Sequence, residues 1–257
     1  MKKAILIASF GTTCESAIQS CILPLEQAAA AAYPDDTVHH CFTSDMVIHR
    51  LSGQGIFVDS PAQALARLLR EGYQQIAVLP TMLTRGSEYE KLLTCINDFQ
   101  SSFPRLTVAA PLLDQEEDLK AVASFIHNAY ALQENEALLL MGHGTAGSEN
   151  SIFRALAKIL QNTDPRIFLA ALEGPPALSP AIRKIVERGY PNVLVAPLML
   201  TAGTHAVKHL SGASDTSWLS QCRAAGLETR CCLTSLGTYT EIQELYLRHL
   251  SASLAEN

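Results

Sequence analysis

Three side chains in the second half of the chain are of types that together bind divalent metal ions. His143 lies in the segment Gly142-His143-Gly144-Thr145, directly after an apolar run, and Glu173 ends another apolar run before a glycine-proline turn. His205 follows a third such run. Two imidazoles and one carboxylate are a ligand set that first-row divalent ions accept, with coordination positions left for a substrate. The sequence therefore predicts a metal site formed by these three residues.

Each of these residues also has a plainer interpretation. His143 could be a loop histidine hydrogen-bonded to the backbone, and Glu173 could cap the turn that follows it. His205 and His209 have the i, i+4 spacing of a zinc-binding helix pair, a pattern that also arises by accident on helix surfaces. The residue types alone leave these alternatives open.

An internal repeat indicates how the chain positions these groups. The stretches 71–88 and 188–205 share Gly-Tyr, Pro, Met-Leu-Thr and Gly at a constant offset of 117 residues. The openings of the two copies also correspond, with Phe10-Gly11-Thr12 aligned with His143-Gly144-Thr145. The two copies differ where chemistry would occur, because Phe10 is aligned with His143 and Glu88 with His205.

Strands that alternate with helices predict parallel sheets joined by right-handed crossovers. The predicted fold class is α/β, with two similar parallel-sheet halves, an internal duplication, that face each other across a central cleft. Because ligands collect at the carboxyl ends of parallel strands, His143, Glu173 and His205 should converge at one sheet edge. We expect an N-terminal half at 1–113, a bridging helix at 114–133 that packs on both halves, and a C-terminal half at 134–257 that carries the metal-binding residues.

The expected elements are as follows. Strands are expected at 3–9, 37–43, 75–80, 106–110, 137–142, 166–172, 192–197 and 228–233. Helices are expected at 14–32 with a break near Pro24, 61–71, 87–101, 115–132, 149–162, 180–188, 204–210 and 239–254. Ser60-Pro61 and Ser179-Pro180 each predict a helix start with serine at N-cap and proline at N1.

The composition limits the classes of partner. The chain has 257 residues, of which 48% are hydrophobic, and a net charge of −6, which argues against a nucleic-acid partner. Its apolar runs are too short to span a membrane, and the run after Met1 is too short for a signal peptide, so we expect a cytoplasmic protein. Seven scattered cysteines without a Cys-x-x-Cys pair predict reduced thiols rather than disulfides or a cysteine-bound metal.

The Gly-His-Gly-Thr loop, the Leu-Glu-Gly segment at Glu173 and the segment Pro-Leu-Met-Leu-Thr-Ala-Gly-Thr-His that ends at His205 together resemble the anaerobic cobalt chelatase group of the class II chelatases. The resemblance covers essentially the whole chain. It implies a metal-inserting lyase that places Co²⁺ into sirohydrochlorin on the early-insertion route to cobalamin. Co²⁺ would be a substrate, with Fe²⁺ or Ni²⁺ as other acceptable ions, and no organic cofactor is expected.

The resemblance also implies roles for particular residues. His143, Glu173 and His205 would be the metal ligands, and Arg85 and Glu88 would be pocket groups facing the macrocycle. Arg85 replaces the usual lysine of the family, and a guanidinium does not readily give up a proton.

The chemistry of metal insertion suggests further roles for these residues and for Phe10 and Lys208. Insertion of a divalent metal removes two pyrrole protons, which His143, His205 and Glu88 are placed to accept or relay. Arg85 and Lys208 would offset the carboxylates of sirohydrochlorin. Phe10 would supply an apolar wall for the ring.

Two rival functions remain open at this point. The first is iron insertion, into sirohydrochlorin or a porphyrin, because imidazole and carboxylate accept iron, cobalt and nickel alike. The second is a two-lobed carrier of metal or tetrapyrrole without turnover, since the fold alone does not decide function. The sequence does not fix the oligomeric state.

Overall fold

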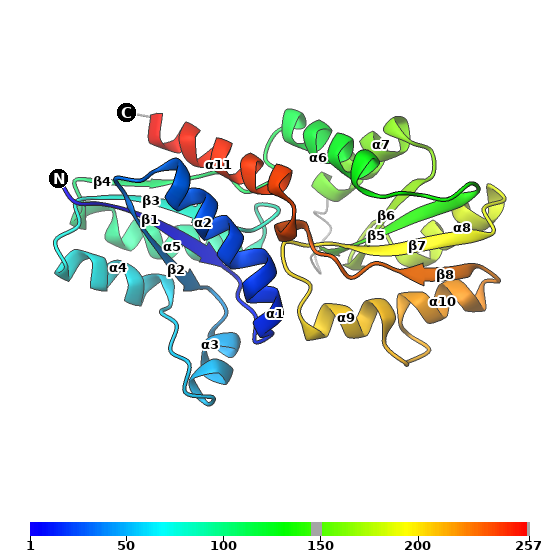
Figure 1. Ribbon diagram of the computed structural model, residues 1–257, viewed down its shortest axis with the longest axis horizontal. Coiled ribbons are helices and arrows are strands. Elements are labelled where there is room, and N and C mark those ends of the chain that lie inside the picture. Colours follow the sequence, from blue (N-terminus) through cyan, green and yellow to red (C-terminus); the bar gives the residue numbers. More distant parts are fainter. Residues whose placement is uncertain (145–150, 256–257) are drawn as a thin grey trace. The chain divides into compact units, whose positions relative to one another are not determined.

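The computed structural model describes residues 1–144 and 151–255, apart from the side chains of Thr204 and His205. The chain forms two compact units (Figure 1). The first unit comprises Met1–Asp114 together with Tyr239–Asn257, and the second comprises Gln115–Thr238. Each unit contains a four-stranded parallel sheet within the described residues.

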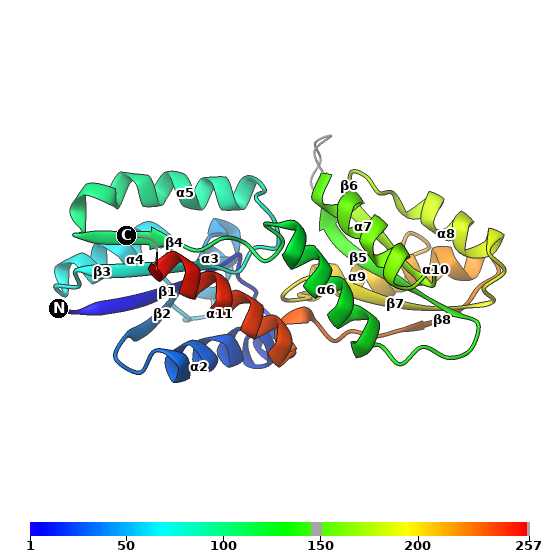
Figure 2. The ribbon, with the colours of Figure 1, turned by 90° about the horizontal axis from the view of Figure 1, so that it is seen from above.

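The sheet of the first unit has the strand order β2-β1-β3-β4. Its strands are β1 (Lys3–Ser9), β2 (Thr37–Phe42), β3 (Gln75–Pro80) and β4 (Arg105–Val108). Helices α2 (Leu23–Ala32) and α11 (Thr240–Ala255) cover one face, and α4 (Pro61–Arg70) and α5 (Ser87–Phe99) cover the other (Figures 1 and 2). The short helices α1 (Glu15–Ala17) and α3 (Asp45–Ser52) follow β1 and β2.

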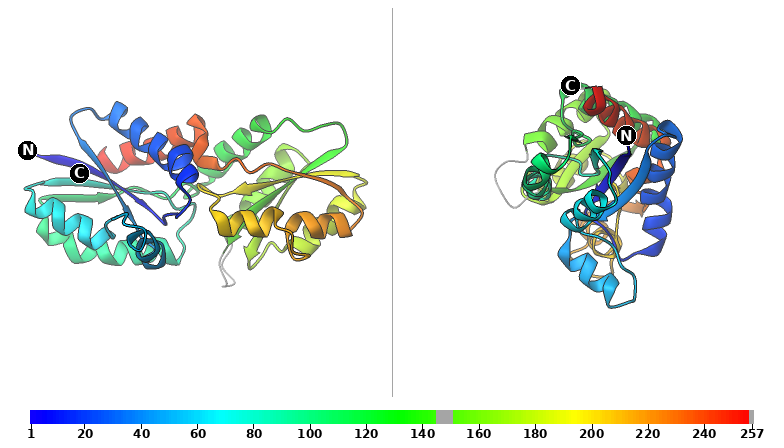
Figure 3. Two further views of the ribbon diagram at one scale, coloured as in Figure 1. Left: turned by 60° about the horizontal axis from the view of Figure 1, so that its bottom comes forward. Right: turned by 90° about the vertical axis from the view of Figure 1, so that its left-hand side faces the viewer.

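The sheet of the second unit has the strand order β6-β5-β7-β8. Its strands are β5 (Glu136–Gly144), β6 (Ile167–Glu173), β7 (Asn192–Leu198) and β8 (Glu228–Cys231). Helices α6 (Glu116–Ala129) and α7 (Ser151–Thr163) pack together on one face. Helices α8 (Leu178–Glu187), α9 (Thr204–Ser211) and α10 (Trp218–Ala224) cover the other (Figure 3, left).

The structure confirms the α/β fold class and the duplication. Both sheets have the same order of strands, and Gly72 and Gly189 end α4 and α8 with positive φ values of 80° and 77°. The glycines of the two strand-end loops also match, since Gly11 has a φ of 94° and Gly144 a φ of 74°. Only glycine adopts this conformation without strain. That the two halves face each other across a cleft stays a prediction.

The expected boundaries differ from the observed units at two helices. The bridging helix α6 belongs to the second unit, and α11 belongs to the first although it follows the whole second unit in sequence. Tyr246 explains this placement, because its side chain is fully buried and its hydroxyl donates to the carbonyl oxygen of Thr81 at 2.8 Å. An apolar helix face in a sequence does not reveal which sheet it will cover.

Smaller differences concern individual elements. Helices α3 and α10 were not expected, and the break near Pro24 is a π-helical turn at Ile18–Ile22. Ser60 caps α4 as predicted, with a capping box to Gln63, whereas Ser179 lies inside α8, whose N-cap is Ala177.

All seven cysteines are free thiols, of which Cys21, Cys41 and Cys222 are buried and the others half-buried. Among the described residues, no helix is both long and apolar enough to span a membrane.

Candidate metal and substrate site

His143 stands at the end of the central strand of the second sheet. Residues Ala137–Met141 of β5 are fully buried, whereas His143 is exposed. Its Nδ1 lies 3.1 Å from the carbonyl oxygen of Gly144. Because a carbonyl oxygen can only accept, this bond places the proton of a neutral imidazole on Nδ1 and leaves the lone pair of Nε2 for a metal ion. The backbone-bonded loop histidine and the ligand are therefore compatible interpretations.

The neighbour Gly142 allows helix α7 to close tightly on this strand end. A Cβ atom at Gly142 would lie only 2.6 Å from a ring carbon of Phe153 in α7. The strand that carries His143 is thus fixed against a buried aromatic ring. Thr145 of the motif lies outside the described residues.

Glu173 lies beside this loop because of the strand register. β5 and β6 are paired so that Gly144 is opposite Glu173, the last residue of β6. Glu173 is exposed, and the chain then turns back through Gly174, with a φ of 73°, so that the carbonyl oxygen of Pro176 accepts from the N–H of Ala171 at 2.7 Å. The predicted glycine-proline turn is confirmed, and it leaves the carboxylate at the sheet edge.

His205 comes from the third strand connection at the same edge. β7 pairs with the other side of β5, and His205 is the second residue of α9, the helix that follows β7. Its side chain lies outside the described part of the structure. The loop before α9 is anchored by Ser235, whose buried hydroxyl accepts from the N–H of Ala202 at 2.8 Å. His209 lies one turn further along α9.

The strand order therefore brings the three predicted ligand positions to adjacent strand ends. β6, β5 and β7 are consecutive in the sheet, and Glu173, His143 and His205 follow from them in that order. Among the described residues, a set without the side chain of His205, no three histidine, cysteine, aspartate or glutamate side chains are grouped to hold a metal ion. The strand order thus brings the backbone of these three residues to neighbouring strand ends. That their side chains together bind a metal ion stays a prediction.

The strand registers of the two sheets also show which residues of the first unit correspond to these three positions. β1 and β2 pair Ser9 with Phe42, as β5 and β6 pair Gly142 with Ala171. Continuing both pairings by two residues aligns Ser44 with Glu173. The first unit thus has phenylalanine, serine and glutamate where the second has histidine, glutamate and histidine, which confines the predicted ligand set to the second unit.

The predicted substrate-binding residues lie at the carboxyl edge of their own sheets. Phe10 follows β1 and its side chain is 47% exposed, as an apolar wall for a ligand requires. Glu88 is the second residue of α5, and its Oε2 accepts from the hydroxyl of Thr43 at 2.8 Å. Lys208 is exposed on α9 of the second unit.

Arg85 is less available as a cation than the sequence suggested. Its Nε donates to Asp114 at 2.6 Å, and its guanidinium stacks over the ring of Tyr89 at 5.2 Å. The hydrogen bond with Asp114 raises the pKa of Arg85. Asp114 therefore offsets much of the positive charge that was expected for a carboxylate-rich substrate, although the side chain of Arg85 remains 53% exposed.

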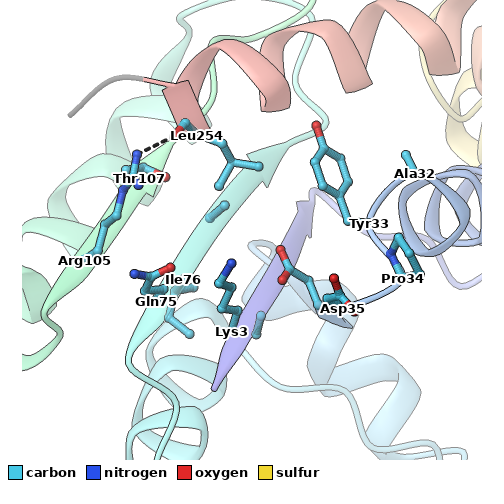
Figure 4. Close-up of a pocket in the computed structure, with 13 residues that line it drawn as sticks. Lys3, Ala32, Tyr33, Pro34, Asp35, Gln75, Ile76, Arg105, Thr107 and Leu254 are labelled. Carbon is cyan, nitrogen blue, oxygen red and sulfur yellow. Dashed lines mark hydrogen bonds between the residues drawn. The ribbon is translucent and has the colours of Figure 1, made fainter. Parts of the chain in front are cut away.

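A cavity of about 350 Å³ in the first unit lies away from these loops (Figure 4). It is lined by Lys3, Gln75 and Arg105, the first residues of β1, β3 and β4, and by Tyr33 and Leu254. These residues mark the amino ends of the strands, at the edge opposite Phe10 and Glu88. The cavity is therefore separate from the candidate site.

Similarity to known proteins extends over almost the whole chain. The model of the cobalt chelatase (CbiK) family matches residues 3–255. The sirohydrochlorin cobaltochelatase of Salmonella typhimurium is 31% identical over 256 residues, which cover 99% of this chain and 97% of that protein. The sirohydrochlorin cobaltochelatase CbiKC of Nitratidesulfovibrio vulgaris is 28% identical, over 99% of this chain and 91% of that protein.

A solved structure agrees with these sequence matches. SirB from Bacillus subtilis with Fe³⁺ superimposes with a TM-score of 0.68 at 17% identity, over 99% of this chain and 96% of that one, so the two proteins share a fold. Because the family model spans almost the entire sequence and a full-length relative exceeds 30% identity, this chain belongs to the cobalt chelatase (CbiK) family.

Proposed function

We propose that this protein is a sirohydrochlorin cobaltochelatase, a metal-inserting lyase that acts in the cytoplasm in anaerobic cobalamin synthesis. The observation that supports this most directly is the order of the strands β6, β5 and β7, which carries Glu173, His143 and His205 to neighbouring strand ends. The names of the two relatives supply the substrates, Co²⁺ and sirohydrochlorin.

In the proposed reaction the protein holds the metal ion only to transfer it. Nε2 of His143 is the donor atom that the Gly144 bond leaves available, and Glu173 and His205 complete the ligand set. The two pyrrole nitrogens that carry protons lose them, and the electron pairs left on these nitrogens bind the metal. Neutral imidazole and carboxylate groups accept these protons near neutral pH, with Glu88 as a further acceptor.

The substrate contacts follow from the exposed groups at the strand ends. Phe10 packs against the flat ring, and Lys208 pairs with carboxylates at its rim. Arg85 contributes hydrogen-bond donors more than net charge, because Asp114 is paired with it.

The test is anaerobic absorbance of the protein mixed with sirohydrochlorin and Co²⁺, beside His143→Ala, His205→Ala and Glu173→Gln. We expect multiple turnovers from the parent and a loss of about 10²-fold or more in the histidine variants. His49→Ala is the matched control, since His49 is exposed on α3 of the first unit, and it should turn over like the parent.

The same assay separates the rival functions. Fe²⁺ and Ni²⁺ in place of Co²⁺, and a dicarboxylate porphyrin in place of sirohydrochlorin, measure the preference for each substrate. A stoichiometric spectral shift without turnover would indicate a carrier. Parent-like rates in both histidine variants would reject the ligand assignment.

A further inference from the structure

The hydroxyl of Thr43 is a buried hydrogen-bond donor whose acceptor is the carboxylate of Glu88. Thr43 follows β2 directly and is 2% exposed, and its Oγ1 donates to Oε2 of Glu88 at 2.8 Å. The two residues lie 45 positions apart in the sequence. Because one carboxylate oxygen is engaged, Oε1 is the atom that this bond leaves to accept a proton.

Hydrogen bonds hold both the backbone N–H and the backbone carbonyl of Thr43. Its N–H donates to the carbonyl oxygen of Ser9 at 2.8 Å, at the end of β1. Its own carbonyl oxygen accepts from Nζ of Lys91 at 3.0 Å, and the same Nζ donates to Asp45 at 3.1 Å. The backbone of Thr43 is therefore held in place beside Glu88 independently of the Glu88 side chain.

The second unit shows which residue occupies this position when the counterpart of Glu88 is a histidine. The strand registers that align Ser44 with Glu173 also align Thr43 with Leu172, which packs against the apolar core. A hydroxyl buried in such a place costs free energy unless it finds a partner. The polar residue thus occurs in the copy that has Glu88, and the apolar residue in the copy that has His205.

We infer that Thr43 is a positioning residue that orients the carboxylate of Glu88 for proton transfer, an inference that rests on the proposed chelatase function. In this step the pyrrole N–H bond breaks, an O–H bond forms at Oε1 of Glu88, and the electron pair stays on the nitrogen for the metal. The proton then passes from Glu88 to water. A glutamate side chain has three rotatable bonds, and fixing it in advance lowers the entropic part of the barrier.

The experiment compares kcat and KM of Thr43→Val, Thr43→Ser, Glu88→Gln and the double variant Thr43→Val with Glu88→Gln. We expect Thr43→Val to lower kcat by about 10-fold or more, with KM for both substrates within about 2-fold of the parent. Thr43→Ser keeps the hydroxyl and should restore most of kcat. The double variant should match Glu88→Gln, because without the carboxylate the hydroxyl has nothing to position.

Thr107→Val is the control for replacing a threonine in the first sheet. Thr107 lies on β4 and lines the cavity at the opposite sheet edge, so kcat should not change. Thermal unfolding of every variant checks that the fold is intact.

The outcomes separate the inference from the function on which it rests. If Thr43→Val turns over like the parent, or Thr43→Ser is as slow as Thr43→Val, the positioning role is wrong while the chelatase function stands. If Glu88→Gln alone turns over like the parent, Glu88 has no catalytic role and Thr43 has none to assist. A parent without turnover would reject the proposed function together with this inference.

Discussion

The adjacent residues His39 and His40 on β2 have pKa values that are shifted in opposite directions. Nδ1 of His40 lies 3.1 Å from the carboxylate of Glu26, and the interaction with this carboxylate raises the pKa of His40. Burial lowers the pKa of His39, which lies next to Tyr73. Neither residue lies at the candidate site.

These pKa shifts predict two opposite changes in stability. The contribution of His40 is present below its unfolded pKa of about 6.5 and is lost as the pH rises through its raised folded value. The contribution of His39 is present above about 6.5 and is lost as the pH falls through its lowered folded value. Relative to the parent, His40→Gln should therefore lose stability in acid, and His39→Gln should gain stability there.

Urea unfolding at about pH 5.5 and about pH 8.5, on either side of the ordinary histidine pKa, measures both effects. Glu26→Gln should weaken the protein in acid as His40→Gln does, because it removes the same pair. Shifts of the same sign in the His39 and His40 variants would contradict the assignment.

At the residue scale, the sequence indicated candidate site residues whose chemical type differs between the two copies. It could not indicate residues whose importance depends on a hydrogen bond or ion pair to a distant part of the chain. His143 and Glu173 stand out because each ends an apolar run, and they lie at the carboxyl ends of β5 and β6. Thr43 and Ser235 carry no such signal, since a buried threonine or serine is recognised only when its partner, far away in sequence, is known. The ion pair between Arg85 and Asp114 was missed for the same reason.

The Ser-Pro-Ala motif occurs at the start of α4 and of α8, and its two copies make different capping contacts. The hydroxyl of Ser60 accepts from the N–H of Gln63 at 3.3 Å, and the side chain of Gln63 accepts from the N–H of Ser60 at 2.9 Å. Ser179, in the equivalent sequence, is already inside α8. The similarity in sequence therefore does not extend to the capping contacts.

Ser60→Ala should lower the free energy of unfolding by about 1 kcal/mol, because the hydroxyl that accepts from the N–H of Gln63 is lost. Ser179→Ala should change it by less than about 0.5 kcal/mol, as expected for a position without a cap. Urea denaturation of the two variants in parallel tests the difference. Equal losses would show that Ser179 caps its helix in solution.

At the element scale, long apolar or periodic segments were predictable and short helices were not. The eight expected strands all form, because runs such as Ala137–Met141 are buried on both faces of a parallel sheet. Helices α3 and α10 are eight and seven residues long, and their starts are marked by the serine N-caps Ser44 and Ser217. A single cap residue is too common in loops to predict a helix.

At the scale of the whole molecule, α11 ties the end of the chain to the unit at its beginning. Tyr246 is the largest fully buried side chain of this helix, and burial raises the pKa of its phenol. Its hydroxyl donates to the carbonyl oxygen of Thr81, the residue after β3, and so anchors the loop that leads to Arg85 and Glu88. The sequence predicted the helix but assigned it to the wrong half.

Tyr246→Phe should destabilise the protein by about 1 to 2 kcal/mol, since a buried carbonyl loses its donor. Hydrogen exchange should accelerate in β3 and residues 81–86 and stay unchanged in β5 and β7. Tyr190→Phe, in the second unit, is the control and should leave exchange in the first unit unaltered. Faster exchange in β5 instead of β3 would contradict the observed division into units.

Metal binding should stabilise the unit that carries the ligands. At about 100 times its dissociation constant, Co²⁺ should add about 2.7 kcal/mol to the free energy of unfolding, because the unfolded chain lacks the assembled site. Exchange should slow in β5 and β6, and a chelator should reverse both effects. His143→Ala should abolish the gain, and an undiminished gain in that variant would place the metal elsewhere.

The position of α11 also bears on the order in which the protein folds as it is synthesised. Residues 115–238 are synthesised before α11, so the second unit has all its described elements while one face of the first sheet is covered by α2 alone. Ile5 and Ile7 point to that face, because the alternate residues of β1 pack under α4 and α5. Nascent chains of multidomain proteins usually fold from the amino terminus onward. Here the second unit should finish first, and the first should expose an apolar surface to chaperones until its last helix leaves the ribosome.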